Sequence, residues 1–191
     1  MFNLMKKRVF IAINLPENAK NKLEEIQRKT ENSFSYFNGV CPVIWTRKNN
    51  LHITLLFLGN IETEELFEVF EKLETITSKT EPVEINLSSI TYAPKDNPRM
   101  VWVNGEKSKE LKELQESIDE ELFNHGNKEF NVHITLGRIR QWQFKRINKE
   151  EIPELEQIDL NFKANSIEVM ESELKRGGAV YTTLKSFPLN S

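Results

Sequence analysis

The chain has 191 residues, of which 26 are basic and 29 acidic, and its formal net charge is −3. This length suits one domain over residues 1–191, made of two closely packed lobes. The small negative charge excludes a protein that coats long nucleic acids through a broad basic surface, so a nucleic-acid partner would be held at a local site such as an end. The single cysteine, Cys41, excludes an internal disulfide and is typical of a reducing cytoplasm.

Apolar periodicity predicts alternating strands and helices in the first half of the chain. No apolar run reaches the length of a membrane-spanning helix. In chain order we expect a strand over 9–13, a helix from Pro16 to about Lys29, a loop over 32–42, strands over 43–45 and 51–58, and a helix capped by Thr63.

The second half continues in the same way. We expect strands over 83–88 and 100–103, a helix capped by Ser108 and ending before Gly126, and strands over 132–136, 158–164, 167–170 and 179–184. Strands joined by hairpins and a few helices are typical of an α+β fold with mainly antiparallel sheets. We therefore predict two related lobes flanked by helices, with an active-site cleft between them.

One tetrapeptide, His-Ile-Thr-Leu, occurs twice, at residues 52–55 and 133–136. With only three histidines in the chain, chance would produce such a pair on the order of once in ten thousand. Each copy lies in a predicted strand that stops at a glycine, Gly59 or Gly137. Because side chains alternate along a strand, each histidine points to the same face as the threonine two residues later. Packing alone gives no reason for that repeat, which predicts a functional site.

Two histidines and two hydroxyl groups suit the hydrolysis of a phosphodiester. One imidazole can take a proton from water while the other gives a proton to the departing oxygen, since both titrate near neutral pH. The hydroxyl groups can donate hydrogen bonds to the phosphate. A metal centre is disfavoured because the remaining candidate ligands, Cys41 and His125, lack ligand-like spacing to either motif. We expect no metal and no cofactor.

The paired motifs resemble those of the two-histidine phosphoesterases, and their context resembles the LigT-like RNA 2′,3′-cyclic phosphodiesterases, formerly called 2′-5′ RNA ligases. The similarity recurs in the same order along most of the chain, at residues 8–12, 15–16, 45–46, 50–55, 57–59, 98–102, 133–138, 171–174 and 178–181. Gly137 stands where the family often has alanine.

The resemblance implies hydrolysis of an RNA 2′,3′-cyclic phosphate to a 2′-phosphate in a water-filled cleft. It implies that His52 is the general acid for the leaving 3′ oxygen and His133 the general base for water. Thr54 and Thr135 would hold the phosphate. The residues alone treat the two histidines alike, so the division of roles comes from the family.

Arg138 stands at the family's basic position after the second motif and is a candidate for substrate binding. Being five residues from His133, it points to the other face of a regular strand unless the strand bends at Gly137. A salt bridge behind the sheet is the alternative. Trp45, Tyr92 and Tyr181 are candidates to stack on a nucleobase, although aromatic residues in strands more often belong to the core.

The expected partners are RNA ends or small nucleotides that carry a 2′,3′-cyclic phosphate, with no membrane and no obligate protein partner. Three other functions stay open. The site could act on another small cyclic phosphate, it could run in reverse as a 2′-5′ ligase, or it could bind phosphate ends without turnover. The intact histidine and threonine pairs disfavour a mere binder, which could use arginine or lysine instead.

Overall fold

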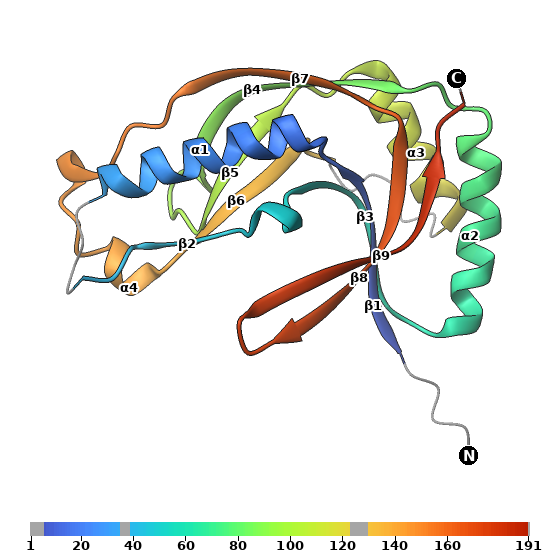
Figure 1. Ribbon diagram of the computed structural model, residues 1–191, viewed down its shortest axis with the longest axis horizontal. Helices are drawn as coiled ribbons and strands as arrows, with labels where there is room; N and C mark the ends of the chain where they lie inside the picture. The colour runs from blue at the N-terminus through green and yellow to red at the C-terminus, as the bar shows by residue number, and fades with distance from the viewer. Residues whose placement is uncertain (1–5, 35–38, 123–129, 191) are drawn as a thin grey trace.

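The computed structural model describes residues 6–34, 39–122 and 130–190, which form one curled sheet covered by helices (Figure 1). The sheet order is β7-β4-β5-β6-β3-β1-β8-β9, and β2 pairs with β6 off this path. All the pairings are antiparallel. The strands are β1 (Lys7–Asn14), β2 (Val43–Trp45), β3 (His52–Ile61), β4 (Val83–Ala93), β5 (Met100–Gly105), β6 (His133–Ile139), β7 (Gln157–Ala164), β8 (Ser166–Lys175) and β9 (Gly178–Pro188).

This architecture confirms the predicted α+β fold with mainly antiparallel strands. The strands fall into two groups, β7-β4-β5-β6 from the middle of the chain and β3-β1-β8-β9 from its two ends, so the groups cross the first and second halves of the sequence. The groups join through β6 and β3 into a single sheet. The two strands that carry the repeated motif are therefore direct neighbours at the junction.

The helices cover one face of this sheet. They are α1 (Glu17–Ser33), α2 (Thr63–Thr77), α3 (Lys109–Leu122) and α4 (Gln141–Phe144), with short 3-10 turns η1 (Lys48–Asn50) and η2 (Lys149–Glu151). Apolar residues of α1, α2 and α3 join Ile53, Leu55, Ile134 and Leu136 in one core. The alternate side chains of the motif strands consequently lie on the opposite face. Within the described ranges, no helix is both long and apolar enough to span a bilayer.

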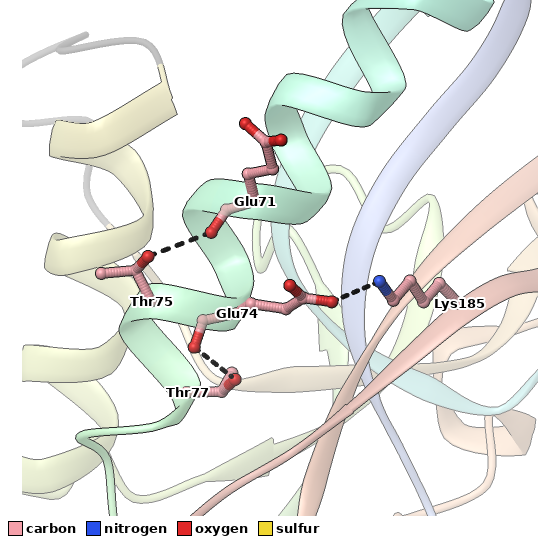
Figure 2. Close-up of polar contacts among 5 residues, drawn as sticks. All are labelled: Glu71, Glu74, Thr75, Thr77 and Lys185. Carbon is pink, nitrogen blue, oxygen red and sulfur yellow. Dashed lines mark hydrogen bonds and ion pairs between the residues drawn. The ribbon is translucent and has the colours of Figure 1, made fainter.

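Helix α2 is fixed to the C-terminal strand by polar contacts (Figure 2). The Lys185 ammonium of β9 forms an ion pair with Glu74, and it lies 5.2 Å from the centre of the Phe70 ring. Near the end of the helix, Thr75 Oγ1 donates a hydrogen bond to the Glu71 carbonyl. Beyond it, the backbone N–H of Asn190 donates to the Thr77 carbonyl. The Lys185 and Asn190 contacts hold α2 against the C-terminal segment, whereas the Thr75 bond lies within the helix.

Several element boundaries differ from the sequence predictions. Helix α2 is capped by Glu62 and not by Thr63, because Glu62 and Glu65 form a reciprocal capping box. The Ser108 cap is confirmed by its hydrogen bond from the Leu111 N–H. Both motif strands continue past the glycines that were expected to end them. Gly59 remains paired with β1, and Gly137 is paired with β2 and β5.

Candidate active site

The two motifs lie side by side because of the pairing between β3 and β6. Ile53 pairs with Ile134 in antiparallel register, and both side chains are fully buried on the helix side. In that register His52 lies across from Thr135, and Thr54 lies across from His133. All four polar side chains point to the face away from the helices. The geometry thus brings the four predicted residues of the two motifs together on one surface.

His52 is oriented by contacts at both ring nitrogens. Its Nδ1 lies 2.7 Å from the backbone carbonyl of Asn50, which can only accept, so Nδ1 carries a proton. Its Nε2 lies 3.0 Å from Thr54 Oγ1. The ring packs against Phe10, with centroids 4.9 Å apart, and the edge of Tyr181 at 5.2 Å. Nε2 is therefore the atom available to exchange a proton at the site.

Burial lowers the pKa of His52 below its ordinary value. The hydrogen bond to the Asn50 carbonyl opposes this effect, whereas the charges of His133 and Lys20 lower the pKa further. A lowered pKa favours the neutral imidazole in the free protein. An anionic phosphate placed beside the ring would act in the opposite direction and favour protonation.

His133 has a matching arrangement. Its Nδ1 donates to the Asn131 carbonyl at 2.9 Å, which again leaves Nε2 for the site. Its ring is stacked on Trp102 of β5, with centroids 4.2 Å apart and planes tilted by 33°. Asn104 is its cross-strand partner in β5. An aromatic wall therefore supports each histidine, although the two walls come from different strands.

A β-bulge in β6 brings Arg138 to the face of the two histidines. Thr135 pairs with Trp102, but Arg138 pairs with Met100, so Leu136 is an extra residue in β6. The extra residue reverses the alternation of side chains, and Arg138 is exposed while Ile139 is buried. The strand thus departs from regular alternation one residue before Gly137. Arg138 therefore lies on the same face as His133, although regular alternation over five residues would place it on the other face. It stays a candidate for substrate binding.

The bulge is held in place by α1. The buried Gln27 amide donates to the carbonyls of Thr46 and Leu136, both at 2.9 Å. The Leu136 carbonyl also accepts a hydrogen bond from the Thr46 N–H at 2.8 Å. Gln27 therefore gives the Leu136 carbonyl a second donor and ties it to the Thr46 carbonyl at the point where β2 ends. Sequence reasoning missed this residue, since its helical periodicity indicates only a buried position.

The first motif carries an equivalent bulge. Thr54 pairs with Ala12, while Leu56 pairs with Ile11, so Leu55 is the extra residue in β3. Phe57, five residues after His52, reaches the same face, packs 6.0 Å from Phe10 and is 64% exposed. Phe57 thus corresponds in position to Arg138 of the second motif. The duplicated strands share geometry but present different chemistry.

The aromatic candidates separate into site and core residues. Tyr181 contacts His52, as described above. Tyr92 points into the core, where its hydroxyl donates to the Pro153 carbonyl at 2.9 Å and its ring packs on Phe144. Trp45 also packs against the core. Trp102, which contacts His133, was not singled out from the sequence because its partner lies on another strand.

The repeat is longer than the tetrapeptide. Asn50-Leu51-His52 and Asn131-Val132-His133 show that an asparagine stands two residues before each histidine. The backbone carbonyl of each asparagine accepts the hydrogen bond from Nδ1–H of the histidine. The Asn50 side chain also donates to the Ala179 carbonyl of β9 at 2.8 Å. An alignment of the two copies over six residues would have revealed this signal.

Among the described residues, no three histidine, cysteine or carboxylate side chains are grouped so that they could hold a metal ion. His125, one of the two remaining candidate ligands, lies outside the described residues. Cys41 lies near the Arg140 guanidinium, which donates to the Cys41 carbonyl, and burial raises the pKa of its thiol. A raised pKa keeps this thiol protonated and disfavours a nucleophilic role.

Comparison with known proteins places the duplicated site in a family. A family model described as LigT like phosphoesterase matches twice, at residues 13–103 and 101–181. The RNA 2′,3′-cyclic phosphodiesterase of Methanocaldococcus jannaschii is 31% identical over 185 residues, covering 94% of this chain and 99% of that protein. The protein of the same name from Archaeoglobus fulgidus is 29% identical over 190 residues, covering 94% and 99%.

Solved structures share the fold over nearly the whole chain. The protein TT0787 of Thermus thermophilus has a TM-score of 0.78 and 28% identity, covering 96% of this chain and 98% of that one. The apo form of E. coli LigT has a TM-score of 0.76 and 20% identity, covering 98% and 99%. With the family model matching most of the sequence, the chain belongs to the LigT-like phosphoesterase family.

Proposed function

We propose that this protein is an RNA 2′,3′-cyclic phosphodiesterase that uses two histidines and no metal ion. The observation that carries the proposal is the antiparallel register of β3 and β6, which aligns His52, Thr54, His133 and Thr135 on one face. The names of relatives that match most of the chain support the substrate class. The large hydrophobic core, which contains residues of both strand groups, supports action as one domain over residues 1–191.

The two imidazoles divide the proton transfers. His133 Nε2 takes a proton from water as the water oxygen bonds to phosphorus. The bond between phosphorus and the 3′ oxygen breaks, and His52 Nε2 gives its proton to that oxygen. The phosphate stays on the 2′ oxygen. His133 then releases its extra proton to solvent and His52 takes one up, which resets the pair. The carbonyls of Asn50 and Asn131 assist because they hold each Nδ1 as a donor, which directs Nε2 toward the substrate.

The remaining site residues hold the phosphate. The hydroxyl groups of Thr54 and Thr135 would donate to the non-bridging oxygens, where charge increases in the transition state. Arg138 stands on the same face because of the bulge at Leu136, and its guanidinium would pair with the phosphate. In the free protein Thr54 contacts His52 Nε2, so the incoming phosphate replaces an internal hydrogen bond.

The proposal is tested by the product of a defined reaction. The purified protein is treated with EDTA and incubated with a short RNA ending in a 2′,3′-cyclic phosphate, and the product is identified by phosphorus NMR. We expect a 2′-phosphate. A 3′-phosphate would reverse the proposed orientation of the substrate, and tight binding without turnover would indicate a phosphate-end binding module. If the protein hydrolyses other cyclic phosphates but not the RNA, the substrate is a different small cyclic phosphate.

A further inference from the structure

A pocket of about 280 Å³ opens directly beside His133. Its walls come from the end of β5, the segment after it and the residues that lead into β6. The residues that give it chemical character are Trp102, Asn104, Lys107, Phe130, Asn131 and His133. The proton-transfer steps described above use His133 and the Asn131 carbonyl, and they leave the rest of the pocket without a role.

Asn104 forms the polar wall of the pocket, and hydrogen bonds hold its side chain in one orientation. Asn104 is the cross-strand neighbour of His133. Its amide nitrogen donates to Thr91 Oγ1 at 2.9 Å and to Ser89 Oγ at 3.2 Å, both on β4. With the amide nitrogen held on the β4 side, the amide oxygen is the atom of Asn104 that a ligand can use as an acceptor.

The other walls are aromatic and cationic. Phe130 is buried, and the Lys107 ammonium lies 5.8 Å from the centre of its ring. Trp102 lines the pocket next to His133, and the indole and imidazole rings of these residues are stacked. The pocket thus combines two aromatic rings with an amide and a single cation, and it adjoins the imidazole that acts on the phosphate.

This composition suits a planar heterocycle better than a second phosphate. A phosphate site would gather several cationic or backbone N–H donors, whereas here one ammonium lies over an aromatic ring. Unpaired nucleobases are recognised by aromatic contacts and by hydrogen bonds to their edges, which rings and amides supply. We propose that this pocket binds the nucleobase of the nucleotide whose phosphate lies between the histidines. This inference rests on the proposed function and adds a base-binding subsite to it.

A second aromatic surface offers a competing location for the base. Phe10, Phe57 and Tyr181 lie together near His52, with Phe10 6.0 Å from Phe57 and 5.1 Å from Tyr181. An asparagine is present here too, because Asn14 of β1 is the cross-strand partner of His52. Of these two asparagines, Asn104 is the one whose amide nitrogen is held by hydrogen bonds, to Ser89 and Thr91. The pocket and this surface are built from different residues, so the two locations predict different effects of substitution.

The test compares the binding of two product analogues by calorimetry, which does not depend on turnover. One is adenosine 2′-phosphate, and the other is 1-O-methylribose 2-phosphate, which lacks the base. We expect the nucleotide to bind about tenfold more tightly, as the contribution of one base contact implies. Asn104→Leu and Lys107→Met should each remove most of this preference while leaving the affinity for the ribose phosphate within about twofold.

Lys109→Met is the matched control, because Lys109 lies on α3 and pairs with Glu113 away from the pocket. Its preference for the nucleotide should equal that of the unmodified protein. Equal affinities for the two analogues in the unmodified protein would overturn the subsite. So would a preference that survives both pocket substitutions but disappears in Phe57→Ser. Hydrolysis of a cyclic phosphate is measured separately, so a failure of the proposed function is distinguishable from a failure of the base-binding pocket.

Discussion

Replacing Gly137 by alanine tests how tightly β6 and β2 are packed beside the site. A Cβ at this position would lie 2.5 Å from Val43 Cγ1, 3.1 Å from the Ile44 carbonyl oxygen and 3.1 Å from Trp45 Cε3. Val43 is buried and the Ile44 oxygen belongs to the backbone, so neither can move without shifting β2. Gly137→Ala adds only one methyl group, but here it forces two strands apart.

Overpacking of this kind costs about 1–3 kcal/mol of unfolding free energy. For a chain of this size, that cost corresponds to a decrease in Tm of about 2–12 °C. Urea denaturation followed by circular dichroism gives the free energy directly, and a thermal scan gives Tm.

Gly177→Ala provides a matched control. A Cβ there would lie 2.7 Å from the Arg47 guanidinium, which is the end of a flexible side chain. Arg47 can swing away, at the loss of one exposed hydrogen bond to the Gly177 carbonyl. We expect this variant to lose less than about 0.5 kcal/mol. Equal stability of Gly137→Ala and the unmodified protein, or equal losses in both variants, would refute the packing at β2.

Four further predictions concern the site. Replacing either His52 or His133 by alanine should abolish turnover while the thermal transition stays in place, and retained activity in either variant would contradict the assignment. The profile of kcat/KM against pH should be bell-shaped, because the active pair carries one proton, and a profile flat from about pH 5 to 8 would exclude paired acid and base. In an NMR titration of the free protein, His52 should titrate below the ordinary histidine pKa of about 6.5. Tyr181→Ala should raise the pKa of His52 because it admits water to the ring. An unchanged pKa in this variant would mean that Tyr181 does not control burial of the ring. Arg138→Gln should lower kcat/KM at least about tenfold if the guanidinium binds phosphate, whereas an unchanged value would return Arg138 to a structural role.

Local patterns in the sequence predicted most of the elements and the face on which the motif residues lie. Alternation of apolar residues gave the strands, and Ser108 marked the start of α3 correctly. The same alternation placed His52 and Thr54 opposite Ile53, which is buried. These properties depend on neighbours in the chain, and a single sequence records them.

The features that failed or were missed depend on partners far away in the chain. The expected end of β6 at Gly137 was wrong because β2 pairs with that residue across more than ninety positions of sequence. The bulge at Leu136 arises from unequal pairing with β5, and the contact of Trp102 with His133 follows from the same register. Strand register is set by the folded sheet and cannot be read from either strand alone.

The central claim is that His52 and His133 divide the roles of acid and base, and a substrate with a sulfur leaving group tests it most directly. In a 2′,3′-cyclic phosphate with sulfur at the 3′ bridging position, the departing thiolate needs little protonation, since a thiol has a pKa of about 8.5. The account predicts that His52→Ala hydrolyses this substrate at a rate near that of the unmodified protein, while His133→Ala remains inactive. Failure of the sulfur substrate to rescue His52→Ala, with the fold intact, would contradict it.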